Sequence, residues 1–109
     1  MARVLKTTTA GTLEFTEELV DPDGDTLTID EVILYSINGN TVPSALQNPD
    51  WLSFQSLQST RADGSTLMEV FVTVTASELS KGNDYRFRLR GSDPFETVTR
   101  FVTLRVVFS

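Results

Sequence analysis

The chain has 109 residues, of which 39% are hydrophobic, and a chain of this size supports one hydrophobic core. Its formal net charge is −6. Cysteine and histidine are both absent, which excludes disulfides, thiolate metal sites and the commonest general base. The acidic balance disfavours nucleic acid as a partner, and no apolar run reaches the ~18 residues expected of a membrane-spanning helix.

Hydrophobic and polar residues alternate along most of the chain, which is the pattern of half-buried β-strands rather than helices. The first alternating row covers residues 13–19 and is broken by Glu17. The second covers residues 27–37, and a β-bulge beside Glu31 would explain its one break. Residues 38–40, Asn-Gly-Asn, then predict a tight turn.

The second half of the chain continues this pattern. A strand begins at Trp51, and residues 62–65, Ala-Asp-Gly-Ser, predict a hairpin tip. A short helical turn is expected over residues 76–81. The clearest alternating rows follow the hairpin tip and cover residues 68–76, 85–90 and 98–108.

These elements predict an all-β fold, an antiparallel β-sandwich of about seven strands. Residues 10–109 would form one sandwich domain, and residues 1–9 would be an N-terminal arm or a first strand.

A short motif supports this architecture. Residues 79–87, Leu-Ser-Lys-Gly-Asn-Asp-Tyr-Arg-Phe, resemble the Leu-x-x-Gly-x-x-Tyr-x-Phe stretch of fibronectin-III-like and immunoglobulin-like domains. The resemblance implies that Tyr85 forms a tyrosine corner, in which the hydroxyl bonds upstream backbone and the ring packs in the core.

The turn Asp21-Pro22-Asp23-Gly24-Asp25 is the main candidate for a binding site. Its three carboxylates at alternate positions suit Ca²⁺, which prefers several hard oxygen ligands. It is not an EF-hand loop, because its glycine is the fourth residue rather than the sixth. Asp, Pro and Gly are also ordinary turn residues. We therefore keep two interpretations, with an acidic turn without a metal favoured over a Ca²⁺ site at Asp21, Asp23 and Asp25.

Three segments together resemble a cadherin-like, dystroglycan-type domain. They are residues 15–28 with the acidic turn, the Pro49-to-Phe54 segment Pro-Asp-Trp-Leu-Ser-Phe, and residues 85–93. The family has an Asp-x-Asp-Gly-Asp turn, a Pro-x-Trp-Leu-x-Phe segment and an aspartate after its penultimate strand, which Asp93 matches. The chain lacks the family's later glycine, since Asp93 is followed by Pro-Phe-Glu. The resemblance implies an adhesive or structural β-sandwich of secreted surface proteins or phage virions.

A row of arginines is the second candidate surface. Arg86, Arg88 and Arg90 alternate with apolar residues and are expected to point outward, with Arg100 or Arg105 on a neighbouring strand. This row is either a solvated sheet face or a docking surface for an acidic partner, because arginine forks onto carboxylates and is enriched in interfaces.

Trp51 and the potential catalytic side chains are the remaining candidates for a functional role. Trp51 is expected to anchor the core, with a carbohydrate-stacking platform as the alternative. No catalytic constellation is apparent, because no histidine accompanies the serines and the turn carboxylates do not flank a cleft.

We expect a non-catalytic structural module that works with other protein subunits, either as a homo-oligomer or bound to a capsid or tail lattice. The chain begins with Met1 and shows no signal-peptide pattern, which favours a virion component of a bacterial or archaeal virus. Such a component would be a capsid decoration, head-fibre or tail protein. The first alternative is a calcium-dependent adhesion repeat on a bacterial surface, and the second is a carbohydrate-binding module. No cofactor is required, and Ca²⁺ is the candidate ligand.

Overall fold

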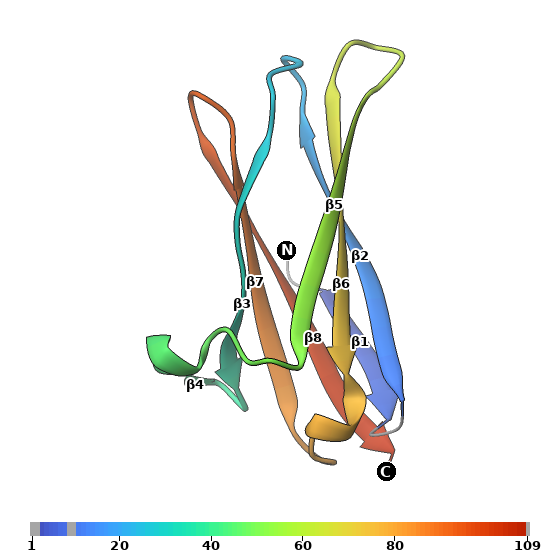
Figure 1. Ribbon diagram of the computed structural model, residues 1–109, viewed down its shortest axis with the longest axis vertical. Coiled ribbons are helices and arrows are strands. Elements are labelled where there is room, and N and C mark those ends of the chain that lie inside the picture. Colours follow the sequence, from blue (N-terminus) through green and yellow to red (C-terminus); the bar gives the residue numbers. More distant parts are fainter. Residues whose placement is uncertain (1–2, 9–10, 109) are drawn as a thin grey trace.

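The chain folds as a β-sandwich of two sheets (Figure 1), and the computed structural model describes residues 3–8 and 11–108. One sheet has five strands in the order β1-β8-β7-β3-β4, and the other has three in the order β2-β6-β5. The all-β prediction is confirmed, with eight strands in the described residues rather than about seven. Their bounds are Arg3–Thr8 (β1), Thr12–Asp21 (β2), Thr28–Ile37 (β3), Asn40–Thr41 (β4), Leu52–Thr60 (β5), Thr66–Thr75 (β6), Asp84–Ser92 (β7) and Thr97–Phe108 (β8).

The core lies between the two sheets and follows the alternating rows of the sequence. The inward residues of β6, from Met68 to Val74, are all buried. Phe15 and Leu19 lie beside them on β2, the neighbouring strand of the same sheet, and are also buried. From the other sheet, Phe87 has no exposed surface. Each such side chain contributes roughly 1.5–3 kcal/mol of hydrophobic stabilisation when fully buried. The predicted core assignments of Val70, Val72, Tyr85, Phe87 and Leu104 are confirmed.

Strand β1 pairs in parallel with β8, from Arg3 opposite Val102 to Thr8 opposite Phe108. The described part of the N-terminal segment is therefore a strand of the sandwich and contacts its own chain. The rest of the predicted arm, residues 1–2 and 9, lies outside the described residues. All other strand pairs are antiparallel.

Two local predictions on β3 are confirmed. The register of β3 against β7 shifts between Ile29 and Glu31, so the predicted bulge is present. Beyond it the inward row moves to Val32 and Leu34, and Ile33, opposite Arg88, lies on the outer face. The prediction that residues 33 and 35 continue the inward row was therefore wrong. Beyond the strand, Asn38 and Gly39 have φ angles of 51° and 83°. Positive φ at both positions is what a two-residue type I′ hairpin turn requires, and this turn joins β3 to β4.

Helical structure in the described residues is confined to two short 3₁₀ turns, η1 (Ser44–Leu46) and η2 (Ala76–Glu78). The second matches the helical turn expected from the sequence. In the described part of the chain, no helix has the length and apolar character needed to cross a membrane.

Tyr85 closes the end of the sandwich at which β7 begins. Its ring is buried, and its hydroxyl accepts the backbone N–H of Ser80 at 2.9 Å and lies 3.3 Å from the Asn83 side-chain amide. The tyrosine corner implied by the sequence is confirmed.

Candidate functional site

Three carboxylates meet at the opposite end of the sandwich. Asp21 ends β2, Asp25 lies in the turn that follows, and Asp93 comes directly after β7. Asp93 reaches the other two because β7 ends at Ser92, which pairs with Thr28 at the start of β3. One ligand oxygen from each residue lies within 4.8 Å of the others. We call Asp21, Asp25 and Asp93 the aspartate cluster.

Asp21 is the buried member of the aspartate cluster, with 3% of its surface exposed. Its Oδ1 accepts the backbone N–H of Asp23 at 2.8 Å, whereas its Oδ2 is buried and has no hydrogen-bond donor while Asp21 and Asp93 are both ionised. A buried polar atom without a partner is costly, and more so when it is charged. The Oδ2 atom therefore calls for either a proton or a cation.

The pKa values of the two closest carboxyls diverge. The pKa of Asp21 is raised above its ordinary value, first by its hydrogen bond to Asp93 and further by burial and by the charges of Asp93 and Asp25. The pKa of Asp93 is lowered, first by the same hydrogen bond and then by the backbone N–H groups of Phe95 and Glu96, both 2.7 Å from Oδ1. When this pair takes up a proton, Asp21 is therefore the carboxyl that carries it and Asp93 is the acceptor.

The donor set fits Ca²⁺. All three side chains offer hard carboxylate oxygens, and Ca²⁺ takes six to eight such ligands in flexible arrangements that include backbone carbonyls and water. A divalent ion would replace the shared proton and neutralise the repulsion among the carboxylates. Chemically, the aspartate cluster can bind a hard cation and hold the end of β2 against the end of β7.

The aspartate cluster differs from the predicted triad by one residue. Asp21 and Asp25 come together, but Asp23 lies outside the cluster with an exposed side chain and contributes only its backbone N–H. Asp93 takes the third position, 68 residues further along the chain than Asp25. Spacing within the turn could not identify Asp93. The family resemblance did indicate this residue.

The turn that carries Asp25 is fixed by a close backbone contact. Gly24 has a φ of 79°, and a Cβ on it would lie 2.5 Å from the carbonyl oxygen of Gly64. Gly64 lies at the tip of the β5–β6 hairpin, which was predicted at residues 62–65. Because Gly24 has no side chain, the acidic turn can pack directly on the hairpin tip. The two loops therefore support each other.

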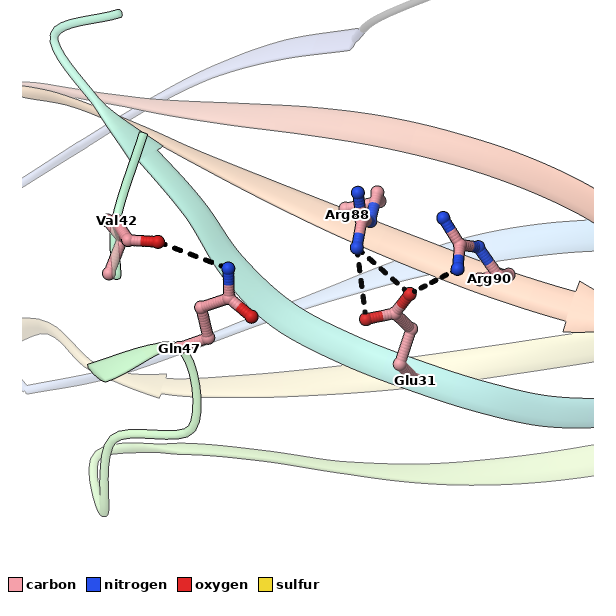
Figure 2. Close-up of polar contacts among 5 residues, drawn as sticks. All are labelled: Glu31, Val42, Gln47, Arg88 and Arg90. Atoms are coloured by element: carbon pink, nitrogen blue, oxygen red, sulfur yellow. Dashed lines mark hydrogen bonds and ion pairs between the residues drawn. The ribbon is translucent and has the colours of Figure 1, made fainter. Parts of the chain in front are cut away.

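The arginine row lies on the outer face of the five-stranded sheet, as its alternation predicted. Figure 2 shows Arg88 and Arg90 directed at one carboxylate, that of Glu31 on β3, at 3.1 Å and 3.0 Å. The other carboxylate oxygen of Glu31 is 3.3 Å from Arg88. The Arg86 guanidinium lies 4.2 Å from the centre of the Phe101 ring, close enough for a cation–π contact.

Two other arginines occupy different faces. Arg100 pairs with Leu89 across the sheet, so it has the parity of the core-facing residues and does not join the row. Arg105 is on the outer face, where it binds both carboxylate oxygens of Asp84 at 3.1 Å. The structure thus shows the row as partly paired, and docking of an acidic partner on it stays a prediction.

Trp51 contacts the core. Its ring meets those of Tyr85 and Phe87 edge-on, with centroids 6.3 Å apart in both cases. A groove of about 490 Å³ beside it is lined mainly by apolar residues such as Leu34, Val42 and Leu46. This arrangement agrees with the core-anchor interpretation.

Comparisons with protein-family models and with curated proteins give no match for this chain. What is established is a β-rich sandwich fold compatible with an immunoglobulin-like domain.

Proposed function

We propose that this chain is a non-catalytic structural module of the cadherin-like, dystroglycan type, and that Ca²⁺ bound by the aspartate cluster stiffens one end of it. The observation that carries this proposal is the buried Oδ2 of Asp21, which lies beside two further carboxylates and has no hydrogen-bond donor while they are ionised. The resemblance of the turn, the Trp51 segment and Asp93 to that family points to the same end of the fold.

The chemistry of the aspartate cluster favours Ca²⁺ over other ions. The chain has no cysteine or histidine, so the softer ligands preferred by zinc and copper are missing. Mg²⁺ requires a compact octahedral arrangement and keeps several waters, whereas Ca²⁺ accepts irregular sets of oxygens. Three carboxylates from a strand end, a turn and a second loop form such an irregular set.

For the biological setting, we propose a structural component of a bacterial or archaeal virus particle, such as a capsid decoration, head-fibre or tail protein. A small module of this kind works through contacts with neighbouring subunits, and the arginine row and the long strand β5 offer exposed surface for them. The alternative is a calcium-dependent adhesion repeat, which is favoured by the position of the aspartate cluster at one end of the sandwich. Mass-spectrometric detection of the chain in purified virus particles, rather than on cell surfaces, would distinguish the two.

Calcium binding is tested by the melting temperature. A ligand that binds only the folded state adds about 2.7 kcal/mol at a hundredfold excess over its Kd, which corresponds to roughly 10 °C for a domain of this size. We expect millimolar Ca²⁺ to raise the melting temperature and Asp93→Asn to abolish the increase.

Asp23→Asn is the matched control. It removes the same charge from the same loop end, but Asp23 lies outside the aspartate cluster. This variant should keep nearly the full calcium response. An unchanged melting temperature of the wild-type protein in millimolar calcium, or an equal loss in both variants, would rule out binding by the aspartate cluster.

A further inference from the structure

Strand β5 forms an open edge of the three-stranded sheet, and its sequence is unlike those of the other edges. Folded proteins usually protect edge strands with charges, prolines, bulges or short length. In the described residues, β1 carries Lys6, β4 has two residues, and β2 carries several acidic side chains. β5 has nine residues, Leu52–Thr60, with no charged residue, no proline and an unbroken register against β6.

From Phe54 to Thr60, the backbone of β5 presents a row of free groups on its open side, whereas the Leu52 N–H donates to the carbonyl of Pro49 at 3.1 Å. Trp51 accepts the N–H of Thr75 at 3.0 Å, and Arg61 donates to the carbonyl of Ser65 at 2.8 Å. In an antiparallel pair these bonds alternate, so the odd-numbered residues of β5 bond to β6. The even-numbered residues, such as Ser56, therefore direct their N–H and C=O groups away from the sheet.

The side chains of β5 are exposed on both faces, and all residues from 53 to 60 are in this class. Phe54, opposite Val72, is on the core-facing side and is 41% exposed. Leu57, opposite Glu69, is on the outer side and is 57% exposed. An added strand would therefore cover one large apolar side chain on each face.

We infer that a second copy of this chain pairs with this edge, β5 against β5, antiparallel about a two-fold axis centred on Ser56. This register overlaps all nine residues of the strand. It joins the two three-stranded sheets into one. The facing pairs would be Ser56 with Ser56, Gln55 with Leu57, Phe54 with Gln58, Ser53 with Ser59 and Leu52 with Thr60.

Charge selects β5 as the edge at which two copies can meet. Each chain has a net charge of −6, so copies repel each other overall, and like charges facing each other across a sheet add to that cost. Pairing of β2 with β2 would bring its glutamates and Asp21 close to their counterparts, whereas β5 pairing brings no charges together. The strand alone buries less than a stable interface of ~1,200–2,000 Å², so the dimer should be weak and favoured at high local concentration.

This inference builds on the proposed role as a structural module, because it names the surface through which the module assembles. It does not depend on calcium. Dimer formation is therefore measured both in EDTA and in millimolar Ca²⁺, and the same β5 contact is expected in both. A protein without a calcium response could still form the β5 dimer. A protein that stays monomeric could still bind calcium.

The absence of cysteine makes disulfide trapping a direct test of the register. Facing residues in a strand pair have Cα atoms about 4.5–5.5 Å apart, within the reach of a disulfide. Ser56→Cys should give a cross-linked dimer under mild oxidation. Ser53→Cys should not cross-link to itself, because its counterpart would lie six residues along the strand, roughly 20 Å away. Mixed with Ser59→Cys, it should cross-link.

Sedimentation equilibrium tests the unmodified chain. The wild-type protein should dimerise as its concentration rises, and Ser56→Lys should remain monomeric because two lysines would face each other across the axis. Ser77→Lys, at an exposed position on η2, is the control and should dimerise normally. A wild-type protein that stays monomeric at millimolar concentration would overturn the proposal, as would self-cross-linking of Ser53→Cys equal to that of Ser56→Cys. An edge reserved for a strand of another protein would give the first of these results.

Discussion

The two ends of the sandwich differ in how their buried polar atoms find hydrogen-bond partners. At the Tyr85 end, the polar atoms of the corner pair within the chain, because the buried hydroxyl accepts the N–H of Ser80. At the aspartate-cluster end, the chain buries a carboxylate oxygen and supplies no donor for it while the carboxyls are ionised. Buried polar groups in folded proteins nearly always have partners. One end is thus complete in the isolated chain, and at the other we propose that a bound cation supplies the missing partner.

The comparison separates the residues that hold the fold from those for which we propose a binding role. Tyr85 is connected to backbone only five residues upstream, so its motif could be read locally. The aspartate cluster combines Asp21 and Asp25 with a residue from a distant loop, and its oxygens face one another. A buried polar side chain near a loop therefore stabilises the fold at the Tyr85 end, whereas at the other end its proposed role depends on a ligand.

The largest effect is expected from removing the complete corner. Tyr85→Ala deletes a buried aromatic ring and should lower the free energy of unfolding by about 3–5 kcal/mol. Tyr85→Phe keeps the ring and removes only the hydroxyl, so about 1 kcal/mol is expected. Urea denaturation of both variants checks this. Equal losses in the two variants would mean that the hydroxyl, rather than the packed ring, dominates the corner.

A smaller effect is expected at the loop end, where Gly24 touches Gly64. Gly24→Ala should lower the free energy of unfolding by about 1–3 kcal/mol through the clash, in addition to the strain of its positive φ. Gly39→Ala has a similar φ of 83° and open space around it, so it isolates the strain. The difference between the losses of unfolding free energy in the two variants measures the contribution of the contact between the loops. No difference would show that the acidic turn moves away from the hairpin without penalty.

The smallest effect, and one of opposite sign, is expected from Asp21→Asn in EDTA. The amide keeps an oxygen for the Asp23 N–H, offers a donor to Asp93 and removes one of three neighbouring negative charges. The melting temperature of this calcium-free variant should therefore rise slightly above that of the wild-type protein, while its calcium response disappears. A fall as large as that of Tyr85→Phe would show that the two ends are equally complete without a ligand.

The sequence predicted the inner strands better than the outer ones. Residues 68–76 alternate strictly because one face of β6 is in the core, and such a row can be recognised without any tertiary information. β5 could be predicted only at its start, because a strand exposed on both faces has no reason to alternate. Its last four residues, Leu57–Thr60, are polar apart from the first and show no alternation.

The pairs of residues that meet on each surface depend on the order of strands in the sheet, which the sequence did not reveal. The acid that pairs with the arginine row is Glu31 on β3, which lies beside β7 on the side away from β8. Likewise Asp93 approaches Asp21 only because β7 ends beside the start of β3. Alternation gives the face of a residue, but its neighbours on that face follow from sheet topology.

The parallel pairing of β1 with β8 has a mechanical consequence. Arg3 begins β1 and faces Val102, whereas Phe108 ends β8 on the far side of the pairing. Tension applied between residues 3 and 108 would pull the two strands past each other along their length. The backbone bonds that join them would then carry the load together, instead of opening one after another as in a hairpin pulled at its free ends. The first and last strands thus form a shear-loaded clamp.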